Sequence, residues 1–318
     1  MVTRIYMQRE LVVQLIRQLN DILRVKDETM INIVKANVKP MEVPLKCYLA
    51  IGSLSAFIWC SLSLPLVFEK STFYYVDYKM PVTYSKEPFS VNMFLLGTAM
   101  ILLGNTYIFL KKVAVDVYTI YLVSLITSQY QYIALKLESI FQVRNVQNNC
   151  GDLPENYNSK TDFIVEQKIK LLCRQHNSVI HITLMLKKLL SLNFSLIYVN
   201  SVFRFCFIGI MLTKISASLL EGSMVILYGS GAIVQFYILC SSVQKLLEAS
   251  TEITDKAFHK DWNQFGISVK RTFMLVMMAS NNLEIKLSTF ARFSLSLPSF
   301  MTVLNQAYSI ALLLLRVK

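Results

Sequence analysis

Five long apolar runs constrain the fold of this chain more than any other feature of its sequence. Each is close to the roughly 20 residues that an α-helix needs to cross the hydrocarbon core of a bilayer. Only 16% of all residues are charged, against about 25% in an average soluble protein. The sequence therefore predicts an all-α, polytopic membrane helical bundle. The runs are Cys47–Phe68, Val91–Leu110, Asn193–Thr213, Met224–Val243 and Phe293–Leu315.

A sixth apolar stretch, Val117–Leu135, follows the second run closely and is rich in Thr, Ser, Gln and Tyr. Between Leu110 and Val117 the chain has neither glycine nor proline, so nothing there favours a turn. We therefore expect one long helix from Val91 to about Phe141. Its first part would cross the membrane, and the rest would project into the cytosol.

The distribution of lysine and arginine sets the expected orientation. The alternating segments 1–46, 111–192 and 244–271 carry 23 of these residues, whereas 69–90, 214–223 and 316–318 carry 6. The positive-inside rule assigns the richer set to the cytosol. We therefore expect a cytosolic amino terminus and an extracellular carboxyl terminus, which excludes a rhodopsin-like topology. Because the charges sort by loop, the net charge of +12 does not indicate nucleic-acid binding.

These boundaries divide the chain into four expected regions. They are cytosolic amphipathic helices over 1–46, a transmembrane helical region over 47–243 with long cytosolic helices at about 113–192, cytosolic helices over 244–292, and a terminal helix over 293–318. The clearest amphipathic segment is Arg9–Arg24, whose Leu and Ile residues share one stripe. Such helices can lie on a membrane surface. We favour their packing against one another below it.

No arrangement of residues supports catalysis or a bound metal. The sequence contains neither a Walker loop nor a G-x-G-x-x-G or H-E-x-x-H motif. His176 and His181 are five residues apart, so they do not share a helix face as metal ligands would. The six cysteines show no paired spacing, which argues against a disulfide framework. We therefore expect no enzyme activity, no cofactor and no metal site.

Two residues inside the apolar runs are chemically unusual. Arg204 lies near the middle of Asn193–Thr213, where a charged side chain costs at least about 2.5–3.5 kcal/mol on insertion scales. It must face protein or water, either in a water-filled cavity or ion path or through a structural hydrogen bond to a neighbouring helix. Pro298, near the start of the last run, removes a backbone hydrogen bond. It marks either a break before a separate pore-side helix or an ordinary transmembrane proline.

The segment Glu69–Ser90 between the first two runs is rich in aromatic residues and proline. Anchoring at the membrane interface is enough to explain such a composition, because amphipathic rings collect at the headgroup level. The alternative is a lid over an apolar pocket. Composition alone leaves both interpretations open.

The end of the chain carries a recognisable motif. Ala307-Tyr308-Ser309 leads into the apolar run IALLLL and then a basic residue. This motif resembles the carboxyl-terminal end of members of the insect odorant receptor family, in which serine is commonest at the position of Ala307. The other positions that carry the resemblance are Pro81, Tyr84, Pro88, Phe89, Asp116, Ala257 and Trp262.

The resemblance implies seven transmembrane helices with inverted topology. The five runs would then be the family's third to seventh spans, and we expect its first two to be missing. That would make the chain a partial gene model, a pseudogene product or a short isoform, with an incomplete pocket and impaired function. A gustatory-type receptor would instead have glutamine and phenylalanine where this chain has Leu314 and Leu315. A secondary transporter would show inverted repeats, which we do not find.

The resemblance also implies a function. It predicts an odorant receptor subunit that binds volatile small molecules and, with a common co-receptor, forms a hetero-tetrameric, odorant-gated cation channel for the sense of smell. The expected location is the plasma membrane of olfactory sensory neurons. The helices of 244–292 would anchor the subunits, and 293–318 would be the pore-side helix. Pore candidates are Asn305, Tyr308, Ser309 and Leu312. Pocket candidates are Trp59, Leu62, Tyr84, Phe89, Phe94, Leu95, Tyr228 and Val234.

Overall fold

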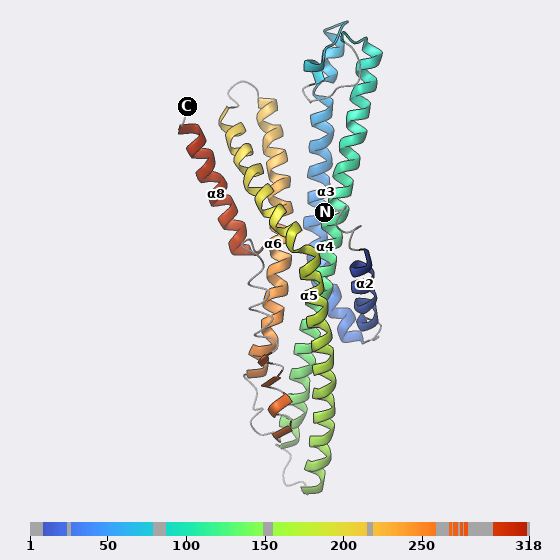
Figure 1. Ribbon diagram of the computed structural model, residues 1–318, viewed down its shortest axis with the longest axis vertical. Coiled ribbons are helices and arrows are strands. Elements are labelled where there is room, and N and C mark those ends of the chain that lie inside the picture. The colour runs from blue at the N-terminus through green and yellow to red at the C-terminus, as the bar shows by residue number, and fades with distance from the viewer. Residues whose placement is uncertain are drawn as a thin grey trace. The chain divides into compact units, whose positions relative to one another are not determined.

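The computed structural model describes residues 9–23, 27–78, 87–148, 155–214, 219–258, 267–278 (without 269, 273 and 276) and 295–316. Within these ranges the named elements are six α-helices and two short 3₁₀ helices, with one isolated β-bridge, so the predicted all-α fold is confirmed. The elements are α2 (Arg9–Leu23), α3 (Glu28–Ser61), η1 (Leu64–Phe68), η2 (Tyr75–Tyr78), α4 (Val91–Asn148), α5 (Glu155–Lys214), α6 (Leu219–Phe258) and α8 (Leu297–Arg316) (Figure 1).

Five helical segments of the described residues are long and apolar enough to cross a membrane. Each overlaps one of the five apolar runs, although the first two segments are much longer than predicted, and the prediction of a multi-span protein is confirmed. α4 also runs without a break from Val91 to Asn148, as the absence of glycine and proline between Leu110 and Val117 predicts. The segments are Glu28–Phe68, Val91–Ile140, Asn193–Leu212, Gly222–Ile253 and Leu297–Arg316.

The chain divides into two compact units, and α3, α4, α5, α6 and α8 contribute residues to both. Unit 1 comprises Met1–Met41, Thr119–Ser201 and Leu239–Val303. Unit 2 comprises Glu42–Tyr118, Val202–Ile238 and Leu304–Lys318. In each unit, segments that are far apart in the sequence form one packed core.

The core of unit 1 is built from the apolar faces of α2, α4, α5 and α6. Leu15 and Leu19 of the predicted α2 stripe are buried, whereas Arg9 and Gln14 are exposed. This is the pattern expected of an amphipathic helix that packs on protein. In α4 the whole stretch 122–130 is buried, so its polar side chains need partners inside the unit. One such pair is Tyr130 and Thr183, whose hydroxyl groups are 2.8 Å apart.

Asp27 connects the start of α3 to α4 within unit 1. Its Oδ2 accepts hydrogen bonds from the ammonium group of Lys136 and the hydroxyl of Tyr132, both at 2.8 Å. Its Oδ1 accepts a hydrogen bond from the backbone N–H of Thr29 at 3.0 Å, in the manner of a helix N-cap. Lys136, then Tyr132 and Thr29, hold the pKa of Asp27 far below its ordinary value.

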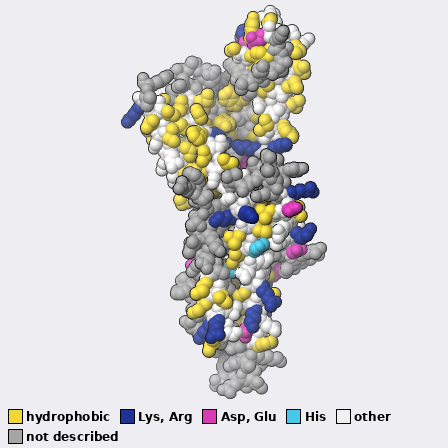
Figure 2. Space-filling view, viewed as in Figure 1, with side chains coloured by type: hydrophobic (Ala, Val, Ile, Leu, Met, Phe, Trp, Pro, Cys, Tyr) yellow, Lys and Arg dark blue, Asp and Glu magenta, His cyan; other side chains and the backbone are white. Residues whose placement is uncertain are grey.

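Unit 2 contains a helical hairpin of α3 and α4, which lie side by side in Figure 1 (blue and teal). Tyr48 and Phe109 are in edge-to-face contact across it, with ring centroids 6.1 Å apart. The α5 and α6 parts of the unit pack through Phe205 and Phe236, also at 6.1 Å. In Figure 2, hydrophobic side chains cover much of the visible surface over α8 and the α3–α4 hairpin. Exposed apolar side chains of this kind are expected where helices face lipid.

α8 begins with a helix cap immediately before Pro298. The backbone N–H of Ser299 donates to Oγ of Ser296 at 3.3 Å, and the N–H of Phe300 donates to the Ser296 carbonyl at 2.9 Å. Proline is well tolerated in the first helical turn, since an N–H there has no intrahelical partner. Pro298 therefore lies in the first turn of α8, and the residues that would decide whether a separate helix precedes it lie outside the described ranges.

Candidate functional site

Unit 2 contains a half-open cavity of about 470 Å³ among α3, α4, α5 and α6. Its volume lies in the range of about 300–1,000 Å³ that is usual for small-molecule sites. The walls are mainly apolar and aromatic, with few polar groups. The apolar lining includes Ile51, Trp59, Phe109, Phe207, Val225 and Tyr228. Such a lining suits a small, largely apolar ligand, whose affinity comes from buried surface and shape.

Two glycines shape the walls of this cavity. A Cβ atom at Gly52 of α3 would overlap the ring of Phe109, and one at Gly231 of α6 would lie 3.1 Å from Cγ2 of Ile51. A longer side chain at either position would have to displace a neighbour or enter the cavity. Because Gly52 and Gly231 have no side chains, the ring of Phe109 can pack directly on α3, and α3 and α6 can approach each other at the cavity wall.

A polar network contributes to the lining of the same cavity. Arg204 of α5 donates one hydrogen bond to Oε1 of Gln235 at 3.1 Å and another to the carbonyl of Ala232 at 3.3 Å. Gln235 in turn donates to Oδ2 of Asp116 at 2.5 Å. The hydroxyl of Tyr48 donates to the same oxygen at 3.1 Å. The network thus draws one side chain from each of α3, α4, α5 and α6.

Arg204 makes the hydrogen bond to a neighbouring helix that one of the two interpretations expected. It lines the cavity, and it also hydrogen-bonds to α6. Its Nε is buried without a hydrogen-bond partner among the residues that the structure describes. A buried, unpaired N–H is uncommon in folded proteins and calls for an explanation. Arg204 therefore retains N–H groups that the described residues leave unpaired.

The segment between α3 and α4 is held by an aromatic cluster formed by Phe73, Tyr78, Phe89 and Phe94. Phe73 and Phe89 pair through two backbone hydrogen bonds of 3.1 and 2.8 Å. The ring of Phe94, which is fully buried, stacks on Phe73 with centroids 4.2 Å apart and lies 4.7 Å from Tyr78. Many aromatic residues of this segment thus have a structural role.

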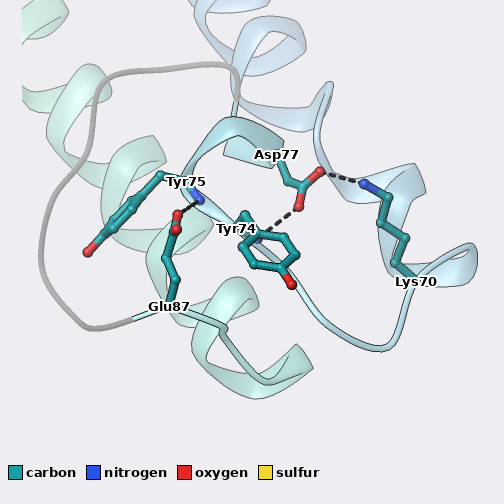
Figure 3. Close-up of polar contacts among 5 residues, drawn as sticks. All are labelled: Lys70, Tyr74, Tyr75, Asp77 and Glu87. Atoms are coloured by element: carbon teal, nitrogen blue, oxygen red, sulfur yellow. Dashed lines mark hydrogen bonds and ion pairs between the residues drawn. The ribbon is translucent and has the colours of Figure 1, made fainter.

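Polar contacts brace the same segment (Figure 3). Lys70 forms an ion pair of 2.7 Å with Asp77, and the backbone N–H of Tyr74 donates to the other carboxylate oxygen at 2.8 Å. Lys70 foremost, with Tyr74, lowers the pKa of Asp77. The backbone N–H of Tyr75 donates to Glu87 at 2.5 Å and so joins the two ends of the segment.

α8 has one buried and one exposed face. Val303, Ala307 and Ala311 recur every four residues and are buried. A Cβ atom at Gly209 of α5 would lie 3.3 Å from Cβ of Ala311, so small residues allow the two helices to approach closely. The four pore candidates occupy exposed positions of the helix, and Tyr308 is 67% exposed. They are Asn305, Tyr308, Ser309 and Leu312.

The structure brings together only part of the predicted pocket set. Trp59 and Tyr228 line the cavity, whereas Phe89 and Phe94 belong to the aromatic cluster. Outside the lining lie Leu62 in the turn after α3, Leu95 on an exposed face of α4 and Val234, half-buried, on α6. Tyr84, like Pro81 and Trp262, lies outside the described residues.

Sequence reasoning missed several lining residues, namely Tyr48, Gly52, Lys112, Gly231 and Gln235. The glycines and Gln235 carried a signal, because each interrupts an apolar run and needs a reason to be there. Lys112 lies just after the second apolar run and was not among the pocket candidates. The partners of these residues could not be assigned, since they lie on other helices.

A sequence model of the 7tm Odorant receptor family matches residues 2–308 of the chain. Two curated proteins illustrate the similarity. The Odorant receptor coreceptor of Aedes albopictus is 23% identical over 180 residues, which cover 57% of this chain and 37% of that protein. Odorant receptor 67a of Drosophila melanogaster is 23% identical over 142 residues, which cover 45% of this chain and 34% of that protein. The matched region thus spans little more than a third of these relatives.

The fold is also similar to that of a solved protein, the insect olfactory receptor OR5 from Machilis hrabei in complex with eugenol. The TM-score is 0.68 with 13% sequence identity, over 91% of this chain and 70% of that one. A second structure of the same receptor gives the same TM-score and covers 99% of this chain. At this level of identity, the likeness is one of fold.

Proposed function

The chain belongs to the 7tm odorant receptor family, as its closing motif predicted, and from this premise we propose that it is an odorant receptor subunit whose cavity in unit 2 binds small apolar odorants. The cavity carries the proposal, since it combines an apolar lining with a volume suited to a small molecule. The family consists of receptors and ligand-gated channels and not of enzymes. The OR5 structure with eugenol supports binding of a small aromatic molecule by a protein of this fold.

Binding in such a cavity is expected to be moderate in strength. Burial of about 200 Å² of apolar ligand surface at about 25 cal/mol per Å² gives roughly 5 kcal/mol before the costs of association. A free energy of about 5 kcal/mol corresponds to a Kd of about 0.2 mM, and the costs of association move the Kd towards about 1 mM or above. We propose Trp59 and Tyr228 as ligand contacts, because both were expected in the pocket from sequence and both line the cavity. Phe89 and Phe94 would act indirectly, by holding the segment between α3 and α4.

We further propose that the subunit works in a hetero-tetrameric, odorant-gated cation channel with a co-receptor. The similarity to a coreceptor and the exposed face of α8 support this assembly. In it, Asn305, Tyr308 and Ser309 would face the pore, and Leu312 would contribute an apolar constriction. The proposed location is the plasma membrane of olfactory sensory neurons, with the amino terminus in the cytosol. An epitope at the carboxyl terminus should be labelled on intact cells, and labelling only after permeabilisation would contradict this orientation.

Trp59 provides a direct test of the cavity. The chain has two tryptophans, so Trp262→Phe leaves Trp59 as the reporter. Titration of the purified 318-residue chain in lipid nanodiscs with hexan-1-ol or methyl hexanoate should change Trp59 fluorescence in a saturable manner. Neither ligand absorbs where tryptophan is excited.

Two glycine substitutions make a matched pair for this test. Gly231→Leu should raise the Kd, because the new side chain meets Ile51 and occupies part of the cavity. Gly104→Leu should leave it unchanged, because a Cβ there meets no atom within 4 Å. Identical titrations for the two variants would show that the signal comes from ligand dissolved in lipid, and would refute the proposed site.

A further inference from the structure

The cavity lining has more positive than negative formal charge. Arg204 and Lys112 both line it, and no acidic residue of the described chain does. Gln235 hydrogen-bonds to both Arg204 and Asp116. Asp116 therefore adds at most one negative charge beside the cavity lining. No ion pair within 4.0 Å joins Arg204 or Lys112 to a carboxylate of the described residues. An apolar cavity in a membrane unit therefore contains an arginine without a direct counter-ion.

Arg204 also has unused hydrogen-bonding capacity. A guanidinium group carries five N–H donors, and Arg204 uses two of its nitrogens, both on neutral oxygens. The third nitrogen, Nε, is buried without a partner and has no surface open to the cavity, so the second N–H groups of the two terminal nitrogens are the donors left for a ligand. A carboxylate is the acceptor that best matches this geometry, because it offers two oxygens and one negative charge to a planar fork. Permeant cations would be repelled by the same charges, so the cavity is poorly suited to be a cation path.

We propose that the preferred ligand of this cavity is a short-chain carboxylic acid, bound as its carboxylate to Arg204 with its hydrocarbon chain against the apolar walls. This proposal rests on the proposed odorant site and specifies its ligand class. The ionised head would accept hydrogen bonds from the terminal nitrogens of Arg204 and, together with Asp116, offset the two positive charges of the lining. The tail would contact residues such as Trp59 and Val225. An alcohol or ester of equal length would retain the apolar contacts but leave the charge of Arg204 uncompensated.

The test compares hexanoate, methyl hexanoate and hexan-1-ol on the purified full chain in neutral-lipid nanodiscs at pH 7, with Trp59 fluorescence as the readout in the Trp262→Phe background. Hexanoate should bind about tenfold more tightly than either neutral ligand, as expected for hydrogen bonds between charged groups. Arg204→Gln should remove this preference, so that the Kd values for hexanoate and methyl hexanoate come within about threefold of each other. Arg204→Lys should retain part of the preference, because it keeps the charge but loses the planar fork.

A wild-type measurement keeps the test valid if the arginine variants do not fold. The preference for hexanoate should shrink as the pH is lowered towards about 4, where a carboxyl group becomes half neutral. If water alone satisfies the hydrogen bonds of Arg204, the three ligands should have equal Kd values at pH 7. That result would overturn this proposal and leave the proposed odorant site standing. So would an undiminished preference for hexanoate in a folded Arg204→Gln variant. Failure of all three ligands to bind would overturn the odorant site itself.

Discussion

Replacement of Phe94 by alanine should open the segment between α3 and α4 without unfolding the rest of unit 2. Phe94 is fully buried, stacks on Phe73 at 4.2 Å and contacts the tilted ring of Tyr78 at 4.7 Å. It lies near the start of α4, whereas both partners lie in the segment itself. The substitution therefore removes the side chain that attaches the segment to the helix.

The size of the effect follows from these contacts. Truncation of a buried phenylalanine to alanine costs about 3–5 kcal/mol in well-packed cores. Because the cluster lies at one end of a helical hairpin and can partly collapse, we use the lower value of about 3 kcal/mol. Phe94→Leu keeps most of the buried apolar surface but loses two aromatic contacts worth about 0.5–1.5 kcal/mol each. The expected cost of Phe94→Leu is therefore about 1–3 kcal/mol.

Hydrogen exchange measures the opening directly. The N–H groups of Phe73 and Phe89 bond to each other's carbonyl groups, so they exchange only when the segment opens. A cost of about 3 kcal/mol corresponds to a roughly hundredfold faster exchange in Phe94→Ala. Mass spectrometry of peptides that contain these amides gives the rate. Peptides from the α5 and α6 parts of unit 2 report whether the change is local.

Phe68→Ala is the matched control, because Phe68 lies in the same segment but is 93% exposed. It should leave the exchange of Phe73 and Phe89 unchanged. The cost of about 3 kcal/mol for the loss of the buried ring predicts a much larger effect than about fivefold. Exchange in Phe94→Ala that accelerates by less than about fivefold would therefore refute the assigned role of the cluster. Equal acceleration in Phe68→Ala, or throughout α5 and α6, would do the same.

Three further predictions concern unit 1 and α8. Asp27→Asn should lower the thermal unfolding temperature in detergent at pH 7. The substitution should matter less below about pH 4. The low pKa of Asp27 in the folded state stabilises the protein at pH values above the ordinary pKa of about 3.9, and this stabilisation is lost as the pH falls towards the pKa of the folded state. Burial lowers the pKa of His176 to about 4, so the unfolded state is protonated first and stability should fall by up to about 3 kcal/mol between pH 6.5 and 4. Denaturant titrations should show this slope in the wild type and not in His176→Gln. Tyr308→Cys should react with a thiol reagent at least about tenfold faster than Ala311→Cys, since the native side chains are 67% and 6% exposed.

Hydropathy and local patterns were sufficient to predict the helices. The absence of glycine and proline before Val117 predicted the continuous α4, and the apolar stripe of Arg9–Arg24 predicted that Leu15 and Leu19 are buried. These features depend on residues within one helix turn of each other or on the length of an apolar run. Such information is local and can be read directly from the sequence.

The cavity could not be predicted in the same way. Its walls depend on which residue of one helix faces which residue of another, such as Gly52 opposite Phe109 and Gly231 opposite Ile51. Periodicity in the sequence identifies the apolar face of a helix. It does not identify the helix that packs against that face, or how far the two helices are shifted along their axes. Trp59 and Tyr228 were pocket candidates from the sequence and do line the cavity. The same reasoning could not separate them from Leu95, which faces outward.

The aromatic residues of the segment between α3 and α4 show a different limit. Composition predicted interfacial anchoring or a lid, and both interpretations treat each ring separately. In the structure Phe73 and Phe89 also form a backbone bridge, and their side chains belong to one cluster with Phe94. An aromatic ring that packs on another ring and one that contacts a ligand have the same composition. The distinction is made by tertiary contacts alone.

The polar network has a consequence for how the cavity should be tested. Tyr48, Asp116, Arg204 and Gln235 come from four different helices, and in an apolar environment each depends on the others for its hydrogen bonds. The network therefore helps to fix the relative positions of the helices around the cavity. A substitution that removes hydrogen-bonding capacity, such as Arg204→Leu, would change the shape of the cavity together with its charge. Arg204→Gln and Arg204→Lys retain donors, so a loss of carboxylate preference in the first and its partial retention in the second separates ligand recognition from helix packing.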